Sequence, residues 1–336
     1  MKTWIYDEAI RLDSLRMIER PDPVPGPHEV VLKMRAASLN YRDLAIARGL
    51  YPLGVGAPLV PLSDGAGEVV GIGSEVTRAQ VGQLVCPTYV PGWIDGPPTR
   101  QNGRRRLGGP SDGVLTEYML VDEEALVVAP RHLAPETAAT LPIAAVTAWE
   151  ALYRGGPLAP GDTVVVLGTG GVSLAAIQLA HAGGAQVIAV TRDDRHVGRL
   201  RDLGAHAVVP RGEGDWPSDV LAVTGGRGAD VVIDVVGGPS VARSIAASRV
   251  AGRVHLVGFV AAPSATIDTF DAIRHAVTVR AESAGSRATF EQMNRAIDLH
   301  RITPVVDRVY PVGEITRAFD RLAERGHFGK VVVTLP

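Results

Sequence analysis

The 336-residue sequence has very little cysteine and almost no net charge. Cys86 is the only cysteine, which excludes an intrachain disulfide and any cysteine-rich metal site. The formal net charge of -2 gives no support for a nucleic-acid partner or for an anionic membrane surface. The one basic block of three residues, the arginines at 104–106, more often caps a loop than binds a polyanion. We therefore expect a small-molecule substrate and no nucleic-acid partner.

Long hydrophobic runs are missing too. The most apolar stretches, such as 163–167, are far shorter than the ~20 residues of a membrane helix. The first ten residues have no hydrophobic core of signal-peptide type. We therefore expect no membrane association and a cytoplasmic location.

The pattern of the sequence changes near residue 135. Before about residue 125, strand-like segments such as 29–36 and 65–72 are broken by proline and glycine, which predicts a β-rich domain. Later, aliphatic strands alternate with helices, which predicts a parallel sheet covered on both faces. The expected strands are 163–167, 186–190, 207–209, 231–235, 253–257 and 277–281, and the expected helices are 145–153, 171–182 and 195–203. The run 330–334 is β-branched again, so we expect the tail to fold back onto the first domain.

A glycine-rich turn follows the strand 163–167. Its residues Gly168-Thr169-Gly170-Gly171-Val172-Ser173 match the dinucleotide-binding fingerprint, with Ser173 where a third glycine or alanine usually lies. Gly168 allows the tight turn, and Gly170 lets the backbone approach a pyrophosphate. The N–H groups at the start of the next helix then hold the negative charge. We predict a nicotinamide dinucleotide site formed by Gly168, Gly170, Gly171 and Val172.

The end of the second strand of this domain bears on the choice of cofactor. NAD enzymes carry an acidic residue there that binds the ribose hydroxyls. Here the position holds Thr191, and the neighbouring Arg192, with help from His196, can bind a phosphate. NADP(H) is therefore favoured over NAD(H). In the alternative interpretation, Arg192 is solvated and Asp193 or Asp194 reaches the ribose.

Six short segments carry a resemblance to a known family. They are Ala-Ser-Leu-Asn-Tyr-Arg-Asp at 37–43, Pro-Leu-Ser-Asp-Gly-Ala-Gly at 61–67, Ala-Ala-Thr-Leu-Pro at 138–142, Thr-Ala-Trp at 147–149, Leu-Gly-Ala at 203–205 and His-Phe-Gly-Lys-Val at 327–331. With these segments in order along the whole chain, the sequence resembles the medium-chain dehydrogenase/reductase superfamily. The similarity is to its zinc-free branch, which holds quinone oxidoreductases and zinc-independent alcohol dehydrogenase-like proteins.

The resemblance implies an α/β fold with a Rossmann parallel-sheet domain inserted in a β-rich GroES-like (chaperonin-10-like) catalytic domain. The expected boundaries are 126–286 for the Rossmann domain and 1–125 with 287–336 for the catalytic domain. Homodimers paired through the Rossmann sheets are also implied. Thr147 is expected to touch the nicotinamide end of the cofactor and Lys330 the cofactor phosphates, and Gly258 is counted with the cofactor-binding residues.

The departures from the family concern zinc. Relatives that use zinc hold it with a cysteine, a histidine followed by a glutamate, and a second cysteine or an acidic residue. The matching positions here are Asn40, Ser63 with Asp64, and Ile143. The structural zinc lobe would fall in 90–113, which has no cysteine and is expected to be a long surface loop of unassigned role. One carboxylate and one amide do not make a zinc site, so we expect no metal.

Without a Lewis acid, reducing an electron-poor acceptor is easier than oxidising a simple alcohol. We therefore expect NADPH-driven reduction of a quinone or an α,β-unsaturated carbonyl. By resemblance, Asn40, Tyr41 and Asp64 lie where the zinc machinery would be, and Tyr51 matches a tyrosine of the substrate cleft in quinone reductases. Tyr41 or Tyr51 could donate a proton or hydrogen bond to the developing oxyanion. The simpler alternatives are that Tyr51 packs and that Asp64 braces the glycine turn.

Two other functions stay open on the sequence alone. One is a zinc-free alcohol dehydrogenase or aldehyde reductase. The other is a non-catalytic NADPH-binding protein, as some zeta-crystallin-type relatives are. The natural substrate and the direction of the reaction have no readable motif.

Overall fold

A computed structural model describes residues 1–51, 54–210, 214–324 and 326–336 of the chain. The chain divides into two compact units, each described here by itself. Unit 1 comprises Met1–Val146 and Gly285–Pro336, and unit 2 comprises Thr147–Ala284. The first boundary between the units lies at Val146/Thr147, whereas the sequence predicts 125/126. The second boundary lies at Ala284/Gly285, close to the predicted 286/287. Unit 1 is built from both ends of the chain, as the β-branched tail predicts.

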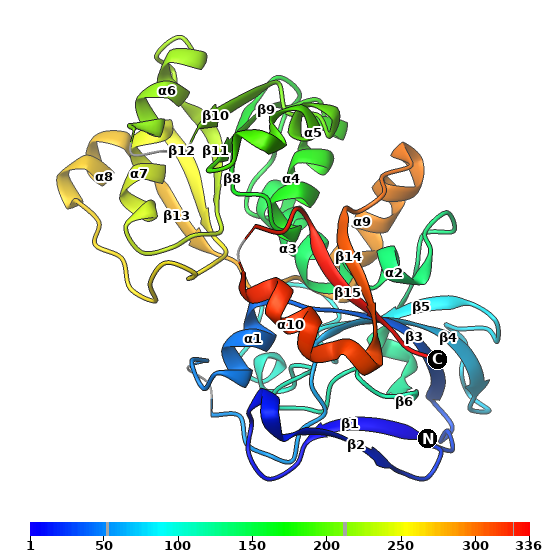
Figure 1. The fold of residues 1–336 in the computed structure, drawn as a ribbon. Helices are drawn as coiled ribbons and strands as arrows, with labels where there is room; N and C mark the ends of the chain where they lie inside the picture. Colours follow the sequence, from blue (N-terminus) through cyan, green and yellow to red (C-terminus); the bar gives the residue numbers. More distant parts are fainter. Residues whose placement is uncertain (52–53, 211–213, 325) are drawn as a thin grey trace. The chain divides into compact units, whose positions relative to one another are not determined.

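Unit 2 is a six-stranded parallel sheet with helices on both faces (Figure 1). In spatial order its strands are β10 (Ala207–Pro210), β9 (Gln186–Thr191), β8 (Thr163–Leu167), β11 (Ala229–Asp234), β12 (Ser248–Leu256) and β13 (Thr278–Ala281). This is the doubly wound order in which the connection reverses direction between β8 and β11. Every residue of β8 is buried, which explains its unbroken aliphatic sequence.

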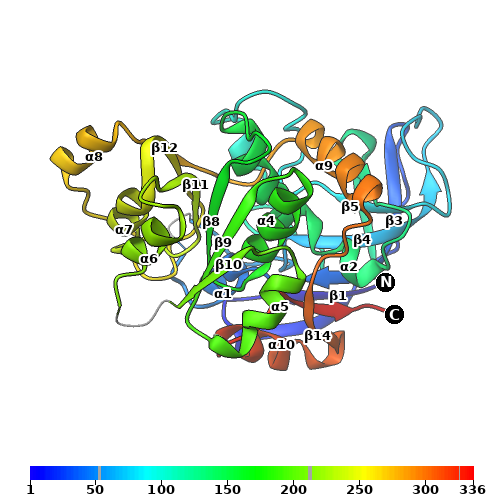
Figure 2. The same cartoon turned by 90° about the horizontal axis from the view of Figure 1, so that it is seen from above.

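The helices of unit 2 lie on the two faces of that sheet. They are α4 (Gly171–Ala182), α5 (Val197–Asp202), α6 (Trp216–Val223), α7 (Ser240–Ala247) and α8 (Thr269–His275). Figures 1 and 2 place α4 and α5 on one face, and α6, α7 and α8 on the other. Val165, Ile188 and Val232 from the sheet pack with Trp216 and Ile245 in one core. Both faces are covered, as the alternation of strands and helices predicts.

Unit 1 is β-rich. Its main sheet has seven strands in the order β14 (Val306–Pro311), β15 (Lys330–Thr334), β3 (Glu29–Ser38), β4 (Asp64–Ile72), β5 (Leu84–Pro87) and β7 (Leu126–Val128), with β6 (Tyr118–Asp122) paired to β3. A separate hairpin consists of β1 (Lys2–Tyr6) and β2 (Leu15–Glu19). The helices are α1 (Tyr41–Ala47), α2 (Pro135–Ala138), α9 (Arg287–His300) and α10 (Ile315–Ala323). The last strand, β15, pairs antiparallel with β3, which joins the two ends of the chain in one sheet (Figure 1).

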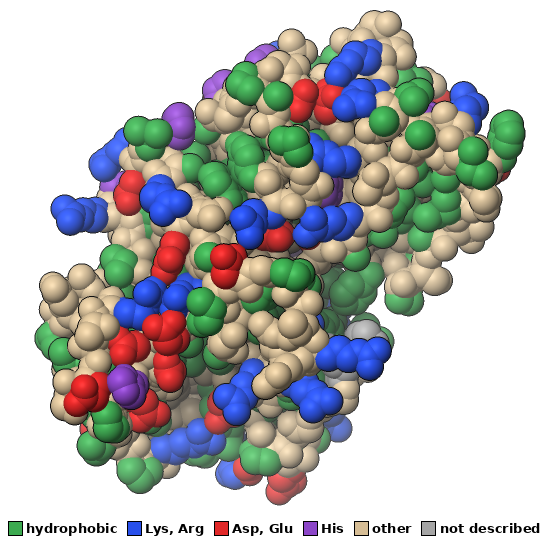
Figure 3. Space-filling view, turned by 180° about the vertical axis from the view of Figure 1, so that it is seen from behind, with side chains coloured by type: hydrophobic (Ala, Val, Ile, Leu, Met, Phe, Trp, Pro, Cys, Tyr) green, Lys and Arg blue, Asp and Glu red, His purple; other side chains and the backbone are tan. Residues whose placement is uncertain are grey.

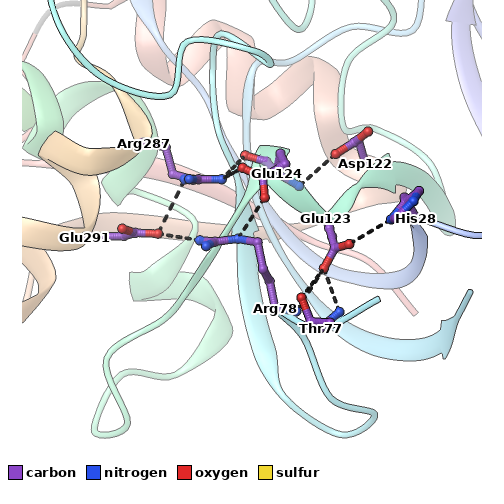
Figure 4. A network of polar contacts seen from close by, with 8 residues as sticks. All are labelled: His28, Thr77, Arg78, Asp122, Glu123, Glu124, Arg287 and Glu291. Carbon is purple, nitrogen blue, oxygen red and sulfur yellow. Dashed lines mark hydrogen bonds and ion pairs between the residues drawn. The ribbon is translucent and has the colours of Figure 1, made fainter. Parts of the chain in front are cut away.

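A polar network ties α9 to the rest of unit 1 (Figure 4). Arg287 at the start of α9 forms an ion pair with Glu124, and Glu291 one turn later accepts a 2.6 Å hydrogen bond from Arg78. Glu123 accepts backbone N–H groups of Thr77 and Arg78 at 2.7 and 2.9 Å. The hydrogen bonds from Thr77 and Arg78 hold the pKa of Glu123 down at about 2. The second piece of unit 1 is thereby fixed to the first by side chains as well as by the sheet.

The segment 90–113 is a surface loop over residues 95–101, which are all exposed, but other parts of it are anchored. Trp93 and Leu107 are buried, and the only regular element described in it is a 3-10 turn, Asn102–Arg104. The Trp93 and Ile94 carbonyls accept N–H groups of Arg287 and Ala288 at 2.9 Å each, which binds the segment to the start of α9. The segment is therefore an exposed loop with buried anchors at Trp93 and Leu107.

Candidate active site

The glycine turn between β8 and α4 has the geometry that a pyrophosphate needs. Gly168 has φ +82°, a left-handed conformation suited to glycine, and its N–H bonds the Val190 carbonyl at 2.7 Å. Gly170 precedes α4, and no side chain caps the helix. A Cβ placed on Gly170 would meet no atom of the protein within 4 Å. The first N–H groups of α4, which include those of Gly171 and Val172, therefore have no side-chain cap, and such a helix start suits the phosphates of a dinucleotide.

Ser173, which replaces the third glycine of the fingerprint, is fully accommodated. Its hydroxyl donates a 2.7 Å hydrogen bond to the Leu167 carbonyl, and the side chain is buried. Across the reversal point, a Cβ on Gly258 would lie 2.0 Å from the Val235 carbonyl oxygen. Gly258 is therefore required by close packing of the chain itself, next to the sheet edge where dinucleotides bind.

The turn after β9 carries a charged cluster. Thr191 is buried at the strand end, and its hydroxyl accepts the N–H of Asp193 at 3.2 Å. Arg192 is exposed. Asp193 accepts three separate N–H groups from Arg195, and His196 Nε2 lies 3.6 Å from Asp193 Oδ2. Sequence reasoning named Asp193 as an alternative ribose ligand but missed Arg195, whose role is visible only in this contact.

Thr147 is buried in a short α-helical segment, α3 (Val146–Trp149). π-helical turns flank it on both sides, at Leu141–Ala145 and Glu150–Arg154. Such turns are rare and often mark functional sites. Thr147 lies in unit 2 with the other cofactor candidates apart from Lys330.

A second cluster lies in unit 1 and consists of Asn40, Asp64 and Lys330. Asn40 precedes α1, Asp64 begins β4 and Lys330 begins β15. The Lys330 ammonium donates a 2.6 Å hydrogen bond to Asn40 Oδ1, and Asn40 Nδ2 donates a 2.8 Å bond to Asp64 Oδ2. Lys330 Nζ also lies 3.5 Å from Asp64 Oδ2. The Asn40 amide thus bridges the Lys330 cation and the Asp64 anion. The sequence analysis expected Lys330 to touch the cofactor phosphates instead.

Burial dominates the electrostatics of this cluster. Asp64 is 0% exposed and Lys330 6% exposed. Burial raises the pKa of Asp64 to about 6, although Lys330 and Asn40 oppose the shift. Burial also lowers the pKa of Lys330, with Asp64 opposing that shift. The other carboxylate oxygen, Asp64 Oδ1, is buried with no hydrogen-bond partner among the described residues. The cluster therefore contains a buried acceptor that no described side chain satisfies.

A supporting network surrounds the start of α1, and sequence reasoning missed its centre. Asp43 accepts the Asn40 N–H at 2.8 Å and the Ser63 hydroxyl at 2.8 Å. The Arg42 guanidinium donates to the Ser63 hydroxyl and to the Leu107 and Gly109 carbonyls, the last two at 2.9 and 2.8 Å. Arg42 thus joins the segment 90–113 to α1 and bonds Ser63, the residue before Asp64.

The tyrosine candidates lie around Arg42. The Tyr51 and Tyr89 rings are each 5.1 Å from the Arg42 guanidinium carbon, so one cation contacts both rings. Burial raises the pKa of Tyr89 well above its usual range. Tyr41 is the first residue of α1 and is partly exposed. The structure therefore brings Asn40, Asp64 and Lys330 into direct contact and places Tyr51 with Arg42.

Comparisons with known proteins agree with this architecture. The family model "Alcohol dehydrogenase GroES-like domain" matches residues 26–131, and "Zinc-binding dehydrogenase" matches residues 171–298. A zinc-type alcohol dehydrogenase-like protein of Schizosaccharomyces pombe is 38% identical over 98% of both chains. The chain belongs to the medium-chain dehydrogenase/reductase superfamily. The expected fold, a Rossmann domain inserted in a GroES-like domain, is confirmed.

Solved structures of this superfamily extend the match. The crystal structure of a candidate alcohol dehydrogenase from Sinorhizobium meliloti 1021 has a TM-score of 0.93, 38% identity, and 99% and 98% coverage of this chain and that chain. An NAD-dependent alcohol dehydrogenase has a TM-score of 0.89 at 29% identity over 100% of both chains. This superfamily member is therefore an alcohol dehydrogenase-like oxidoreductase that uses a nicotinamide cofactor and a small-molecule substrate.

The family names refer to zinc, but the residues at the zinc positions do not fit that metal. Asn40 and Asp64 are bonded to each other and to the Lys330 ammonium, and a buried cation at hydrogen-bond distance opposes a dication. Ser63 is engaged by Asp43 and Arg42, and Ile143 has no donor atom. In the part of the chain that the structure describes, no three His, Cys, Asp or Glu side chains come together as a metal site.

Proposed function

We propose that this oxidoreductase reduces a quinone or an α,β-unsaturated carbonyl with NADPH and works without zinc. The observation that carries the proposal is the buried Asn40–Asp64–Lys330 cluster at the positions where relatives hold the metal. An ammonium can stabilise an oxyanion, but it is a weaker electrophile than a dication. It therefore suits acceptors that are already electron-poor.

The division of tasks follows the two units. The bound nicotinamide supplies a hydride. In unit 2, the backbone around Gly168, Gly170 and Gly258 holds the cofactor, and Thr147 orients its nicotinamide end. In unit 1, the Lys330 ammonium carries three N–H donors, of which Asn40 and Asp64 engage two. We propose that the third N–H binds the negative oxygen that forms on the substrate.

Protonation is the second task of unit 1. Tyr51 is the proposed proton donor, with Tyr41 as the other candidate. The Arg42 guanidinium carbon lies 5.1 Å from the Tyr51 ring, and this contact holds the ring beside the polar network of α1. The proton-donor role combines with Lys330 to stabilise an enolate or a hydroquinone anion until it is protonated.

The preference for NADPH is supported by Thr191, Arg192 and His196. Thr191 carries no charge that would repel a phosphate, and the exposed Arg192 can bind one. The solved NAD-dependent relative at 29% identity shows that the superfamily accommodates the other choice as well. The proposed preference is therefore argued from this turn of the chain itself.

A second function, zinc-free alcohol dehydrogenase or aldehyde reductase, is favoured by the names of the relatives. The buried pair of Asp64 and Lys330 could accept and release a proton for such a reaction. A third candidate, a non-catalytic NADPH-binding protein, is less consistent with a buried ion pair that contains an unsatisfied acceptor.

The surface of the described residues bears on which partners we propose: a second copy of the chain, but no nucleic acid and no membrane. On the face in Figure 3, acidic and basic side chains are interspersed, which favours no polyanion as partner. None of the described helices is long and apolar enough to cross a membrane. A homodimer through the Rossmann sheet is supported by β13, an edge strand, and by the exposed Phe270 (77%) and Ile273 (70%) on α8. A cytoplasmic location remains our proposal.

The decisive experiment is a substrate screen with zinc analysis. Purified protein is mixed with NADPH and a panel of quinones, enones and aldehydes, and with NADP and simple alcohols. We expect quinones or enones to turn over fastest and the protein to contain far less than one zinc per chain. Faster oxidation of ethanol or benzyl alcohol than of any acceptor would favour the alcohol dehydrogenase. No turnover, with tight NADPH binding, would favour the non-catalytic protein.

A further inference from the structure

The turn after β9 contains an acidic residue that is paired before any ligand arrives. Arg195 Nε lies 2.9 Å from Asp193 Oδ1, and Arg195 Nη2 lies 2.6 Å from Asp193 Oδ2. This is a bidentate guanidinium–carboxylate contact, the strongest geometry for such a pair. The Arg195 backbone N–H adds a third bond to Asp193 Oδ1 at 3.0 Å. Both oxygens of Asp193 are therefore engaged within the turn.

Asp193 lies next to the position that binds the cofactor ribose, so its pairing with Arg195 bears on the choice of cofactor. The Asp193 N–H bonds the hydroxyl of Thr191, which occupies the strand-end position where NAD enzymes carry their acidic residue. Asp193 is thus held two residues from Thr191, the position that distinguishes the ribose of NAD from that of NADP. Its hydrogen bonds to Arg195 lower its pKa to about 2, so the carboxylate stays ionised at neutral pH. An unpaired carboxylate at this point would repel the extra phosphate of NADPH and could bind ribose hydroxyls instead.

We propose that Arg195 masks Asp193, and that this pair, rather than Thr191 and Arg192 alone, sets the cofactor preference. Asp193 would favour NADH if its charge were not paired. Removing Arg195 should therefore shift the relative affinity of the turn from NADPH toward NADH. The inference rests on the NADPH preference under the proposed function and assigns a residue to it.

Arg192 and Arg195 have different surroundings, so they are expected to act differently. Arg192 is exposed, and no ion pair of its side chain occurs among the described residues. It is suited to contact a phosphate directly. Arg195 directs both guanidinium nitrogens in the bidentate pair at Asp193. Its effect on the cofactor is expected to pass through the charge of Asp193, which makes it a positioning residue for specificity.

The test is a titration of NADPH and NADH binding, followed by fluorescence, and needs no substrate. The variants are Arg195→Ala, Asp193→Asn, the double variant and Arg192→Ala. Arg195→Ala keeps the backbone N–H that bonds Asp193, and Asp193→Asn keeps a side-chain oxygen, so the turn is expected to persist. Arg201→Ala is the matched control, because Arg201 is an exposed arginine of α5 that does not contact Asp193.

Arg195→Ala should weaken NADPH binding by about three- to tenfold, the effect of one unmasked like charge at an exposed site, and leave NADH binding equal or tighter. The double variant should recover most of the lost NADPH affinity. Arg192→Ala should also weaken NADPH, but adding Asp193→Asn should recover little of that loss. Arg201→Ala should change neither cofactor by more than about twofold. Raising the salt concentration should reduce all these differences.

Two results would overturn the inference. If the double variant binds NADPH as weakly as Arg195→Ala, Arg195 contacts the phosphate itself and masking is wrong. If Arg195→Ala leaves both affinities unchanged, Asp193 has no influence on the cofactor. The proposed NADPH preference is tested separately in the wild type. Equal affinity for NADPH and NADH would show that this preference is wrong. In that case the response of the variants still decides whether Asp193 is masked.

Discussion

Under the proposed function, the two units contribute to the reaction by different means. In unit 2, the cofactor cradle is made of backbone: the left-handed Gly168, the open space at Gly170 and the uncapped start of α4. In unit 1, the site is made of buried side-chain charge, with Lys330 and Asp64 bridged by Asn40. Backbone N–H groups bind the pyrophosphate that NAD and NADP share, so this part of the site does not distinguish the two cofactors. A buried ion pair is specific, because losing one member leaves the other charge uncompensated.

The largest expected effect comes from removing the cation of unit 1. Lys330→Met should lower kcat by about 10²–10³, the loss typical of one oxyanion donor. It should also lower the free energy of unfolding by about 3–5 kcal/mol, because Asp64 is left as an uncompensated buried charge. Steady-state kinetics and urea unfolding measure the two effects.

The double variant Lys330→Met with Asp64→Asn is the control for this prediction. It should recover most of the stability but not the activity, which separates charge balance from catalysis. If Lys330→Met instead raises the Kd for NADPH and leaves kcat unchanged, Lys330 binds the cofactor phosphates, as the family resemblance suggested.

A second change asks whether unit 1 also supplies the proton. Tyr51→Phe should slow quinone or enone reduction about a hundredfold if its hydroxyl is the donor, because one donor is worth ~2.7–4 kcal/mol. Tyr41→Phe is the matched variant on α1 and should have little effect in that case. Single-turnover rates with NADPH measure the step. Equal, small effects of both changes would mean that the proton comes from solvent.

The third prediction separates cofactor binding from packing within unit 2. Gly170→Ala meets no protein atom, so it should leave the free energy of unfolding unchanged and weaken NADPH and NADH alike by about tenfold. Gly258→Ala, with a Cβ 2.0 Å from the Val235 oxygen, should destabilise the fold by about 1–3 kcal/mol. Unfolding without cofactor and dinucleotide titration measure the two effects. Normal cofactor binding by Gly170→Ala would place the pyrophosphate elsewhere.

The smallest effect is a dependence on pH that belongs to unit 1 alone. The pKa of Asp64 is raised by burial to about 6, so below that pH Asp64 becomes neutral and no longer supports the Lys330 ammonium. We expect kcat/KM to fall below about pH 6 and Asp64→Asn to abolish this inflection.

The free energy of unfolding should change with pH in the opposite sense. The folded-state pKa exceeds the ordinary value of 3.8, so the contribution of protonated Asp64 is fully present below 3.8 and is lost as pH rises through 6. Binding of NADPH to unit 2 should not share the inflection.

The sequence predicted the elements that depend on local pattern. β8 and α4 have the expected bounds, because an unbroken aliphatic strand followed by glycines is a local signal. The helices α6, α7 and α8 were not predicted. They are short, and α8 leaves Phe270 and Ile273 exposed, so its apolar residues do not mark a buried stripe.

The site was predicted less completely because its contacts join distant residues. Asn40 and Asp64 were identified by their positions in the family pattern, and the structure brings them together. Arg42 was missed, since an arginine in a short helix usually faces solvent, whereas here Ser63, Leu107 and Gly109 bury it. The pairing of Lys330 with Asn40 could not be read from either segment alone.

Lys330 and Asn40 are 290 residues apart in the chain, and strand pairing of β15 with β3 brings them together. During synthesis, α1 and β4 therefore leave the ribosome long before the lysine that balances Asp64 exists. Until the last strand is added, Asp64 can remain hydrated or protonated, but it cannot form its native ion pair. The charge centre of the enzyme is consequently completed last, so a chain that stops short of β15 can contain a finished cofactor domain and still lack the reactive half.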